Sequence, residues 1–212
     1  MAQAYSISAV IGLALAGLVI SNLLHDRGLD SSVSRCLSAA LGGVAFLGAV
    51  TWLDSWTAVW VSGALTLVIL ALRLGFRRGL RGTNGKRSDQ AWAEVTYAIG
   101  GTASLAIGWG LVGDRWLAFL PIAFMAWGDN AAGLTRATIW HDNVASIWPS
   151  TIMLSVCFAA ATLFRPFWIG AVGAIVATAV ERYRPRILRF CDDNLLIVVA
   201  SFTVIIVLSM VT

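Results

Sequence analysis

The chain contains little charge for its length. Only 12% of its 212 residues are charged and 58% are hydrophobic, whereas about a quarter of the residues in a soluble globular domain are charged. The mean hydropathy is +0.81. This shortage of charge argues against an ordinary soluble domain and predicts an all-α, polytopic integral membrane protein. The composition does not change along the chain, so we expect a single transmembrane domain that covers residues 1–212.

Cysteine and histidine are too few and too scattered for two common kinds of site. Cys36, Cys157 and Cys191 form no Cys-x-x-Cys pair, and neither His25 nor His141 has a second histidine four residues away. We therefore expect free thiols that behave as small hydrophobic groups, and no zinc site. The GxSxG, HExxH and Walker A patterns are also missing. Their absence argues against a serine hydrolase, a zinc protease and a P-loop ATPase.

Long apolar runs predict the membrane-spanning helices. A span needs about 20 mostly apolar residues. Eight runs are candidates, at residues 4–24, 36–53, 55–72, 92–112, 115–128, 148–164, 166–181 and 195–211. The run at 115–128 is short, which predicts a helix that ends inside the protein or is extended by its neighbours. No basic segment precedes the first run, so we interpret it as a membrane helix rather than a cleaved signal peptide.

The distribution of arginine and lysine predicts the orientation. If both termini lie on the non-cytoplasmic side, thirteen of the fifteen basic residues fall in cytoplasmic connections, and only Arg115 and Arg165 fall outside. Eight spans satisfy this rule, whereas seven, the alternative count, would scatter the basic residues over both faces. The connections richest in polar residues then lie on the cytoplasmic side, and we expect the functional site there.

An acid and an amide stand side by side where one apolar run ends, in the stretch AWGDNAAGLTRATIW at residues 126–140. Ionisable residues near the hydrocarbon of a bilayer are costly and usually functional. The small residues around Asp129 and Asn130 predict a turn and a new helix whose first N–H groups can bind an anion. Carboxylate and amide oxygens are also ligands that Mg²⁺ accepts. The alternative interpretation is a simple helix cap.

A basic loop precedes the fourth span. Residues 73–90 place six basic side chains around the segment Gly-Thr-Asn-Gly, namely Arg73, Arg77, Arg78, Arg81, Lys86 and Arg87. Guanidinium groups match phosphate oxygens, which predicts a triphosphate site. Such clusters also serve as topology signals or as contacts to anionic lipid, and this alternative stays open. Glu94 and Tyr97 follow at the start of the next helix.

A second Asp-Asn pair lies at the start of the last span, in ERYRPRILRFCDDN at residues 181–194. Glu181 closes one helix, and Asp193 and Asn194 open the next. Each feature alone could be a cap, but two such pairs, a glutamate and a basic loop on one face favour a shared site. The triplet His141–Asp142–Asn143 extends the first constellation. Adjacent residues on a helix do not face each other, so we expect a loop contact there rather than a general base.

Three segments resemble the dolichol kinase and phytol kinase family, integral membrane enzymes that phosphorylate isoprenoid alcohols with CTP. They are GDNAAGLT at 128–135, AEVTYAIGG at 93–101 and ERYRPRILRFCDDNLLIVVAS at 181–201. The similarity over the rest of the chain is weak. The resemblance implies that Asp129 binds metal or nucleotide, and it points to Glu94 with Tyr97, and to Glu181 with Asp193 and Asn194.

The chain also departs from the family pattern. Arg35 matches the arginine that begins an Arg-Lys pair followed by a histidine in the family, and Ser150 matches the serine of a Lys-x-x-Glu-Gly-Ser run. The other positions of these two motifs differ and are Cys36, Ala39, Ala145, Trp148 and Pro149. The resemblance is therefore to a divergent member.

These observations predict a lipid-alcohol kinase that transfers the terminal phosphate of CTP to phytol, geranylgeraniol or dolichol with Mg²⁺. Asp129 and Asp193 would bind the metal, and Glu94 or Glu181 would accept the proton of the alcohol. The residues expected to bind the nucleotide are Arg77, Arg78, Arg81, Lys86, Asn130, Arg136 and Asn194. A CTP-dependent lipid cytidylyltransferase and a non-catalytic transporter or structural protein are the alternatives. No nucleic-acid partner is expected.

Overall fold

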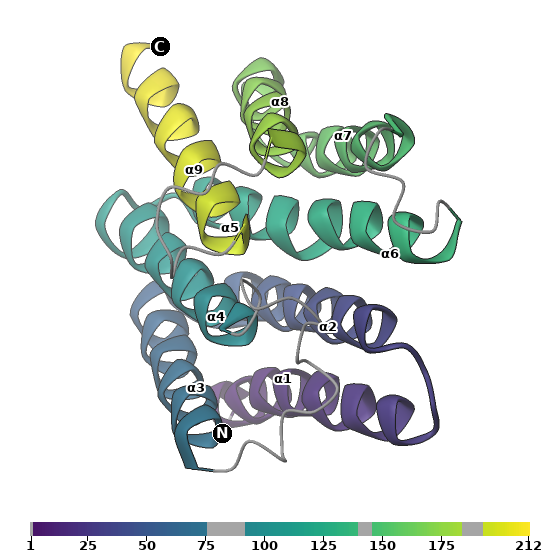
Figure 1. Ribbon diagram of the computed structural model, residues 1–212. Helices are drawn as coiled ribbons and strands as arrows, with labels where there is room; N and C mark the ends of the chain where they lie inside the picture. The colour runs from purple at the N-terminus through teal and green to yellow at the C-terminus, as the bar shows by residue number, and fades with distance from the viewer. Residues whose placement is uncertain (1, 76–91, 140–145, 184–192) are drawn as a thin grey trace.

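The computed structural model describes residues 2–75, 92–139, 146–183 and 193–212, and these residues form a bundle of helices (Figure 1). Five helical stretches are long and apolar enough to cross a membrane, namely Gln3–Asp26, Ser31–Trp52, Ser55–Gly75, Arg115–Thr138 and Asp193–Val211. Trp148–Ala161 is a shorter apolar helix. The structure therefore supports the coarse prediction of a multi-pass helical membrane protein.

The helices follow the predicted apolar runs. Their bounds are α1 (Ala2–Asp26), α2 (Ser31–Trp52), α3 (Ser55–Gly75), α4 (Ala93–Ser104), α5 (Arg115–Ala123), α6 (Asn130–Thr138), α7 (Trp148–Ala161), α8 (Phe167–Tyr183) and α9 (Asp193–Val211). Two π-helical segments extend them: η3 (Leu105–Leu111) continues α4, and η4 (Phe124–Asp129) joins α5 to α6. Each predicted span coincides with one continuous helical stretch, while the number of membrane crossings stays a prediction.

The expected turn and helix start at Asp129 are wrong. Asp129 has helical backbone angles, with φ −61° and ψ −40°, and its side chain does not cap α6. Helix α5, segment η4 and helix α6 instead form one helix from Arg115 to Thr138. Gly128 is small for a packing reason, because a Cβ atom there would lie 2.4 Å from the Cys157 sulfur on α7. Glycines of this kind let membrane helices approach closely.

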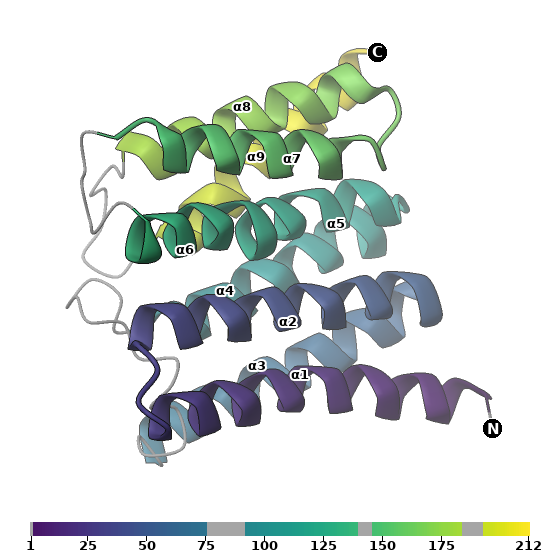
Figure 2. The ribbon, with the colours of Figure 1, turned by 90° about the vertical axis from the view of Figure 1, so that its right-hand side faces the viewer.

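The bundle is layered around this continuous helix (Figures 1 and 2). Helices α1 and α3 lie on one side of the molecule, α2 and α4 come next, and α7, α8 and α9 cover the opposite side of α5–α6. The core consists of large apolar side chains on α5 and η4 and on the helices that cover them, including Phe119, Phe124, Met153, Ile169 and Ile205. The element that carries Asp129 is therefore the centre of the fold.

The helix ends separate into two groups (Figure 2). The start of α2, the ends of α3, α6 and α8, and the start of α9 lie at one end of the bundle, and both chain termini lie at the other. Among the described residues, Arg35, Arg73, Arg136 and Arg182 belong to this group of helix ends, and Arg27 directly follows the end of α1. Arg115, the first residue of α5, and Arg165, in the connection before α8, lie at the opposite end. Which end faces the cytoplasm stays a prediction.

Cysteine accessibility tests the topology. In a background with all three native cysteines replaced by alanine, single cysteines at Gln3 and Thr212 should react with a membrane-impermeant maleimide from outside intact cells. A cysteine at the exposed Asp26, at the other end of α1, should react only after the cells are opened. If Gln3 and Thr212 react from opposite sides, the arrangement of both termini at one end is contradicted.

The packing of η3 against α5 predicts a large effect of a small substitution. A Cβ atom at Gly108 would lie 2.7 Å from the Cα of Ala118, a backbone atom that cannot rotate away. We expect Gly108→Ala to cost about 1–3 kcal/mol of stability, or about 2–4 °C in Tm for each kcal/mol in a chain of this size. Thermal unfolding of the purified protein measures the change.

The matched control is Gly63→Ala on α3, where the nearest atom to an added Cβ is 4.0 Å away. Alanine favours helix over glycine, so this variant should be as stable as the wild type or more stable. Equal Tm values for the two variants would show that η3 and α5 are not in close contact.

Candidate functional site

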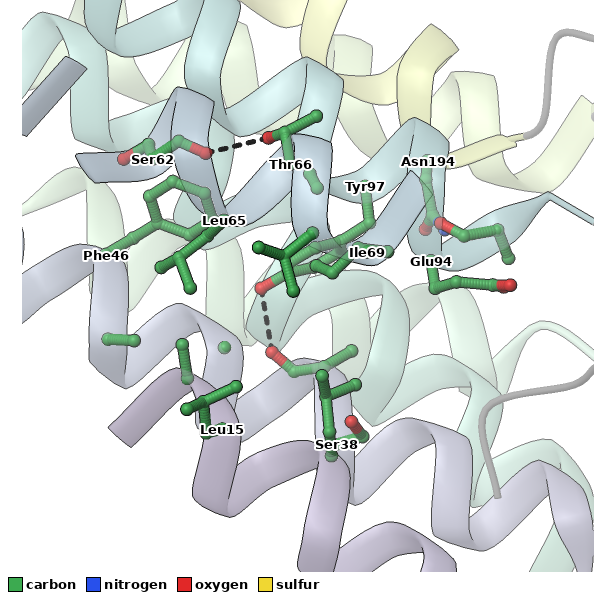
Figure 3. A pocket seen from close by; sticks show the side chains of 18 of the residues that line it. Leu15, Ser38, Phe46, Ser62, Leu65, Thr66, Ile69, Glu94, Tyr97 and Asn194 are labelled. Carbon is green, nitrogen blue, oxygen red and sulfur yellow. Dashed lines mark hydrogen bonds between the residues drawn. The ribbon is translucent and has the colours of Figure 1, made fainter. Parts of the chain in front are cut away.

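A pocket lies at the boundary between the polar and apolar parts of the bundle (Figure 3). Its lining includes charged and amide side chains from five different elements: Arg35 on α2, Glu94 on α4, Asp129 on η4, Asn130 on α6 and Asn194 on α9. Its cavity volume is about 110 Å³, several times the space that one water molecule needs. The structure thus brings the two predicted Asp-Asn segments and Glu94 to one pocket.

Glu94 is a buried carboxylate at the polar end of the pocket. It is the second residue of α4 and is only 8% exposed. The Nη1 atom of Arg73, in the last turn of α3, lies 3.3 Å from its Oε1 atom. The guanidinium of Arg73 also stacks 5.7 Å from the ring centre of Trp92, just before α4. Within the described part of the chain, Glu94 Oε2 is buried and accepts no hydrogen bond, so a ligand in the pocket can use it.

Asp129 and Asn130 reach the same pocket from the central helix. Their exposed fractions are 8% and 7%. The Nδ2 atom of Asn130 donates hydrogen bonds to the carbonyl oxygens of Met125, at 3.2 Å, and Ala126, at 3.0 Å. Both carbonyls belong to η4, a π-helical segment of the kind often found at functional sites. Asp129 precedes the end of α6 by about 14 Å of helix, so its carboxylate lies well inside the bundle.

Asn194 joins the start of α9 to the start of α4. Its Nδ2 atom donates to the carbonyl oxygen of Ala93 at 3.3 Å. Asp193 is the first residue of α9, as predicted, and its Oδ1 atom accepts a hydrogen bond from the backbone N–H of Asn194 at 3.2 Å. Asp193 is not among the residues that line the pocket. A metal ion shared by Asp129 and Asp193 therefore stays a prediction.

The structure places Glu181 and Arg136 together outside the pocket. Glu181 on α8 is fully buried, and its Oε1 atom accepts a hydrogen bond from Nη2 of Arg136 on α6. Neither residue lines the pocket. A buried carboxylate needs such a partner, because an uncompensated charge in a low dielectric is very costly. The pair links α6 to α8 through side chains, and the catalytic role of Glu181 stays a prediction.

Several predicted residues lie outside the described part of the chain. These are the loop residues Arg77, Arg78, Arg81, Lys86 and Arg87, the triplet His141, Asp142 and Asn143, and Cys191. Cys36 and Cys157 are free and buried, as expected.

Most of the pocket wall is apolar, and the sequence alone did not show which apolar residues form it. The apolar residues come from four helices and include Val10, Leu15 and Leu18 on α1, Phe46 on α2, Leu65, Val68 and Ile69 on α3, and Ala98 on α4. Tyr97 joins two of these helices, because its hydroxyl donates a 2.8 Å hydrogen bond to the carbonyl oxygen of Ala39. Periodicity identifies such residues as helix surface, but it does not show which of them share a pocket.

The pocket has a polar end and a long apolar part. Along α2 its lining runs from Arg35 to Ala49, which corresponds to about 21 Å of helix. The hydrocarbon core of a bilayer is about 30 Å thick. Phe46, Ser62 and Leu65 lie toward one end of the pocket, and Glu94 and Asn194 lie toward the other (Figure 3). This shape suits a molecule with one polar end and one long hydrocarbon chain.

Arg35 is a charged residue of the pocket that the sequence interpretation did not assign to the site. It lies in the first turns of α2 and lines the pocket beside the acids. The signal was its isolated charge in the otherwise uncharged stretch SSVSRCLSAALGG at residues 31–43. It also matches the family arginine described above.

The donor groups fit Mg²⁺ that binds together with a polyphosphate. Among the described residues, no group of three or more His, Cys, Asp or Glu side chains is placed to hold a metal ion. Mg²⁺ does not need such a cage, because proteins usually bind it through one or two carboxylates, water and substrate phosphates. The pocket offers hard oxygen donors on Glu94, Asp129, Asn130 and Asn194.

Comparison of the chain with protein families, with curated proteins and with solved structures finds no match. The resemblance to the dolichol and phytol kinases is therefore carried by the quoted segments. Of the residues to which it points, Glu94, Tyr97, Asp129 and Asn194 line the pocket.

Removal of Arg136 should destabilise the protein strongly. Arg136→Ala removes the cation that contacts the buried Glu181, and breaking a buried ion pair costs about 3–5 kcal/mol. The double variant Arg136→Met/Glu181→Leu removes both charges and should recover most of the loss. Thermal unfolding measures both effects.

The control is Arg182→Ala at the neighbouring position of α8. Arg182 is exposed, and its Nη1 atom donates to the carbonyl oxygen of Ser146, so we expect a change below about 1 kcal/mol. Equal losses for Arg136→Ala and Arg182→Ala would refute the structural role of the Arg136–Glu181 pair.

Proposed function

We propose that this chain is a multi-pass membrane enzyme that transfers the terminal phosphate of CTP to the hydroxyl group of an isoprenoid alcohol at the cytoplasmic face. The amphipathic pocket carries the proposal. Buried carboxylates and an arginine lie at its polar end, and apolar side chains from α1 to α4 line the rest. The polar end suits a reacting hydroxyl and a phosphate, and the apolar part suits the hydrocarbon chain of the acceptor.

The chemistry requires positioning and charge neutralisation more than covalent participation of the protein. The alcohol oxygen attacks the terminal phosphorus, the bond from that phosphorus to the bridging oxygen breaks, and CDP leaves. The proton of the alcohol passes to a carboxylate. Glu94 suits this role better than Glu181, because Glu94 lines the pocket whereas Glu181 is bound to Arg136 elsewhere. Arg73 holds Glu94 in place from α3.

The remaining polar residues of the pocket suit the phosphate donor. Asp129 and the amide oxygens of Asn130 and Asn194 would hold Mg²⁺. Asp193 is a further carboxylate beside Asn194, at the start of α9. Bound Mg²⁺ supplies neutralisation of the phosphate charge. Arg35 provides a guanidinium that suits a phosphate oxygen. In this proposal the nucleotide also contacts basic side chains of the loop at 73–90, namely Arg77, Arg78, Arg81 and Lys86.

Phosphate transfer with labelled CTP tests the proposal. Purified protein with Mg²⁺ and CTP labelled in the γ-phosphate should transfer the label to phytol, geranylgeraniol or a longer polyprenol, and ATP should replace CTP poorly. Glu94→Gln and Asp129→Asn should each lower turnover about 10²–10⁴-fold, the range for loss of a general base or a charge-stabilising group. Both variants should remain folded.

The matched control is Asp26→Asn, an exposed carboxylate at the same end of the bundle that does not line the pocket. It should keep wild-type turnover. If the label appears only in pyrophosphate when a phosphorylated lipid is supplied, the protein is a cytidylyltransferase. Unchanged turnover in Asp129→Asn would refute the site, and absence of any nucleotide-dependent reaction would favour a non-catalytic membrane protein.

A further inference from the structure

The pocket has a rim that faces away from the bundle between α1 and α3. Leu15 on α1 and Val68 on α3 both line the pocket, yet they are 41% and 46% exposed. A residue that lines a pocket and is also exposed lies at its opening. Helix α1 packs mainly along α2, and α3 packs mainly along α4, so α1 and α3 touch each other little. The opening therefore lies between these two helices.

This side of the molecule is the one that a bilayer would cover. Only 17% of the apolar window of α1 and 11% of that of α3 is buried in the protein. Exposed side chains on the two helices include Val19 and Leu67, which are apolar. In a membrane protein such surfaces contact lipid tails, so the opening connects the pocket with the hydrocarbon of the bilayer.

The end of the pocket away from the acids is buried, and its hydroxyl groups are already hydrogen-bonded within the protein. Val10, Ala49 and Ser62 line this end and are 3%, 1% and 6% exposed. The hydroxyl of Ser62 donates to the carbonyl oxygen of Ala58 at 2.7 Å, and that of Thr66 donates to the carbonyl oxygen of Ser62 at 2.8 Å. The Thr66 hydroxyl is also 3.0 Å from that of Thr102 on α4. Because the hydroxyl groups of Ser62 and Thr66 have partners within the protein, this end of the pocket suits the end of a hydrocarbon chain.

We propose that a lipid with a single hydrocarbon chain enters this groove sideways from the bilayer, between α1 and α3, and comes to lie with its hydroxyl group beside Glu94 and Asp129. The identity of the polar end as an alcohol rests on the proposed function, while the entry route rests on the rim and the buried far end. Lateral entry keeps the chain in an apolar environment throughout, so the hydrophobic cost of crossing water does not arise.

Photolabelling tests the route without relying on catalysis. The probe is geranylgeraniol with a diazirine at the end of its chain, added to the protein in lipid nanodiscs, with the labelled residues located by mass spectrometry. Label should fall on α1, α2 and α3 along the pocket, and excess unlabelled geranylgeraniol should remove it. Val68→Trp fills the rim and should lower the labelling at least about tenfold, in line with steric effects in apolar pockets.

The matched control is Leu67→Trp, because Leu67 is the adjacent residue on α3, is 67% exposed and does not line the pocket. Leu15→Trp and Val19→Trp form a second such pair on α1. Both members of a pair are exposed on the side of the molecule that faces lipid. Both variants should therefore fold, and their Tm values should be similar. The control variants should label like the wild type.

Three results would overturn the proposal. They are equal labelling of Val68→Trp and Leu67→Trp, label spread evenly over the lipid-facing residues of α7 and α8, and equal competition by phosphatidylglycerol. The test also separates the two proposals. Labelling along the groove without phosphate transfer supports the entry route and contradicts the kinase, whereas transfer with label elsewhere contradicts the route alone.

Discussion

Burial of the helix from Arg115 to Thr138 is the constraint on which the site depends. Within this helix 78% of the apolar window is buried, compared with 11% for α3. Backbone groups inside a bilayer must find hydrogen-bond partners within the protein, and a continuous helix provides them even at Gly128 and Asp129. Because the helix does not break, it carries Asp129 into the centre of the bundle. Helices α2, α4 and α9 then bring Arg35, Glu94 and Asn194 to the same pocket.

The two buried glutamates, Glu94 and Glu181, differ in their surroundings. Each lies near an arginine of another helix, Glu94 near Arg73 and Glu181 near Arg136. Glu181 is fully buried and lines no part of the pocket, so its contact with Arg136 serves to join α8 to α6. Glu94 has a second oxygen that faces no donor within the described residues, and it does line the pocket. The second arrangement leaves a carboxylate ready for a ligand.

The parts of the structure that depend on local pattern could be predicted from the sequence. Apolar runs identified the helices, and the bias of arginine and lysine placed Glu94, Asp129 and Asn194 on one face, where the structure also brings them together. The continuation of the helix through Gly128 was not predicted, because small and polar residues are typical of a turn when they are considered alone. Its burial against α7 is a tertiary effect that local pattern does not contain.

Contacts between residues far apart in the chain were also beyond prediction. Arg136 and Glu181 are 45 residues apart, and both were expected in the site rather than in a pair of their own. Arg35 was used only for the orientation and as a match to a family arginine, although it lines the pocket. The residues that line the apolar groove could not be named for a related reason. Every membrane helix carries apolar side chains, and only the packing shows which of them surround a cavity.

The central claim is that Glu94 and Asp129 belong to one site at the polar end of the groove. A double-mutant cycle on phosphate transfer from CTP to geranylgeraniol measures this most directly, using both single variants and Glu94→Gln/Asp129→Asn. The effects of substituting residues that act as a unit are strongly non-additive. The double variant should therefore be only slightly less active than the less active of the two single variants. Losses that multiply, as expected for distant and independent sites, would contradict the claim.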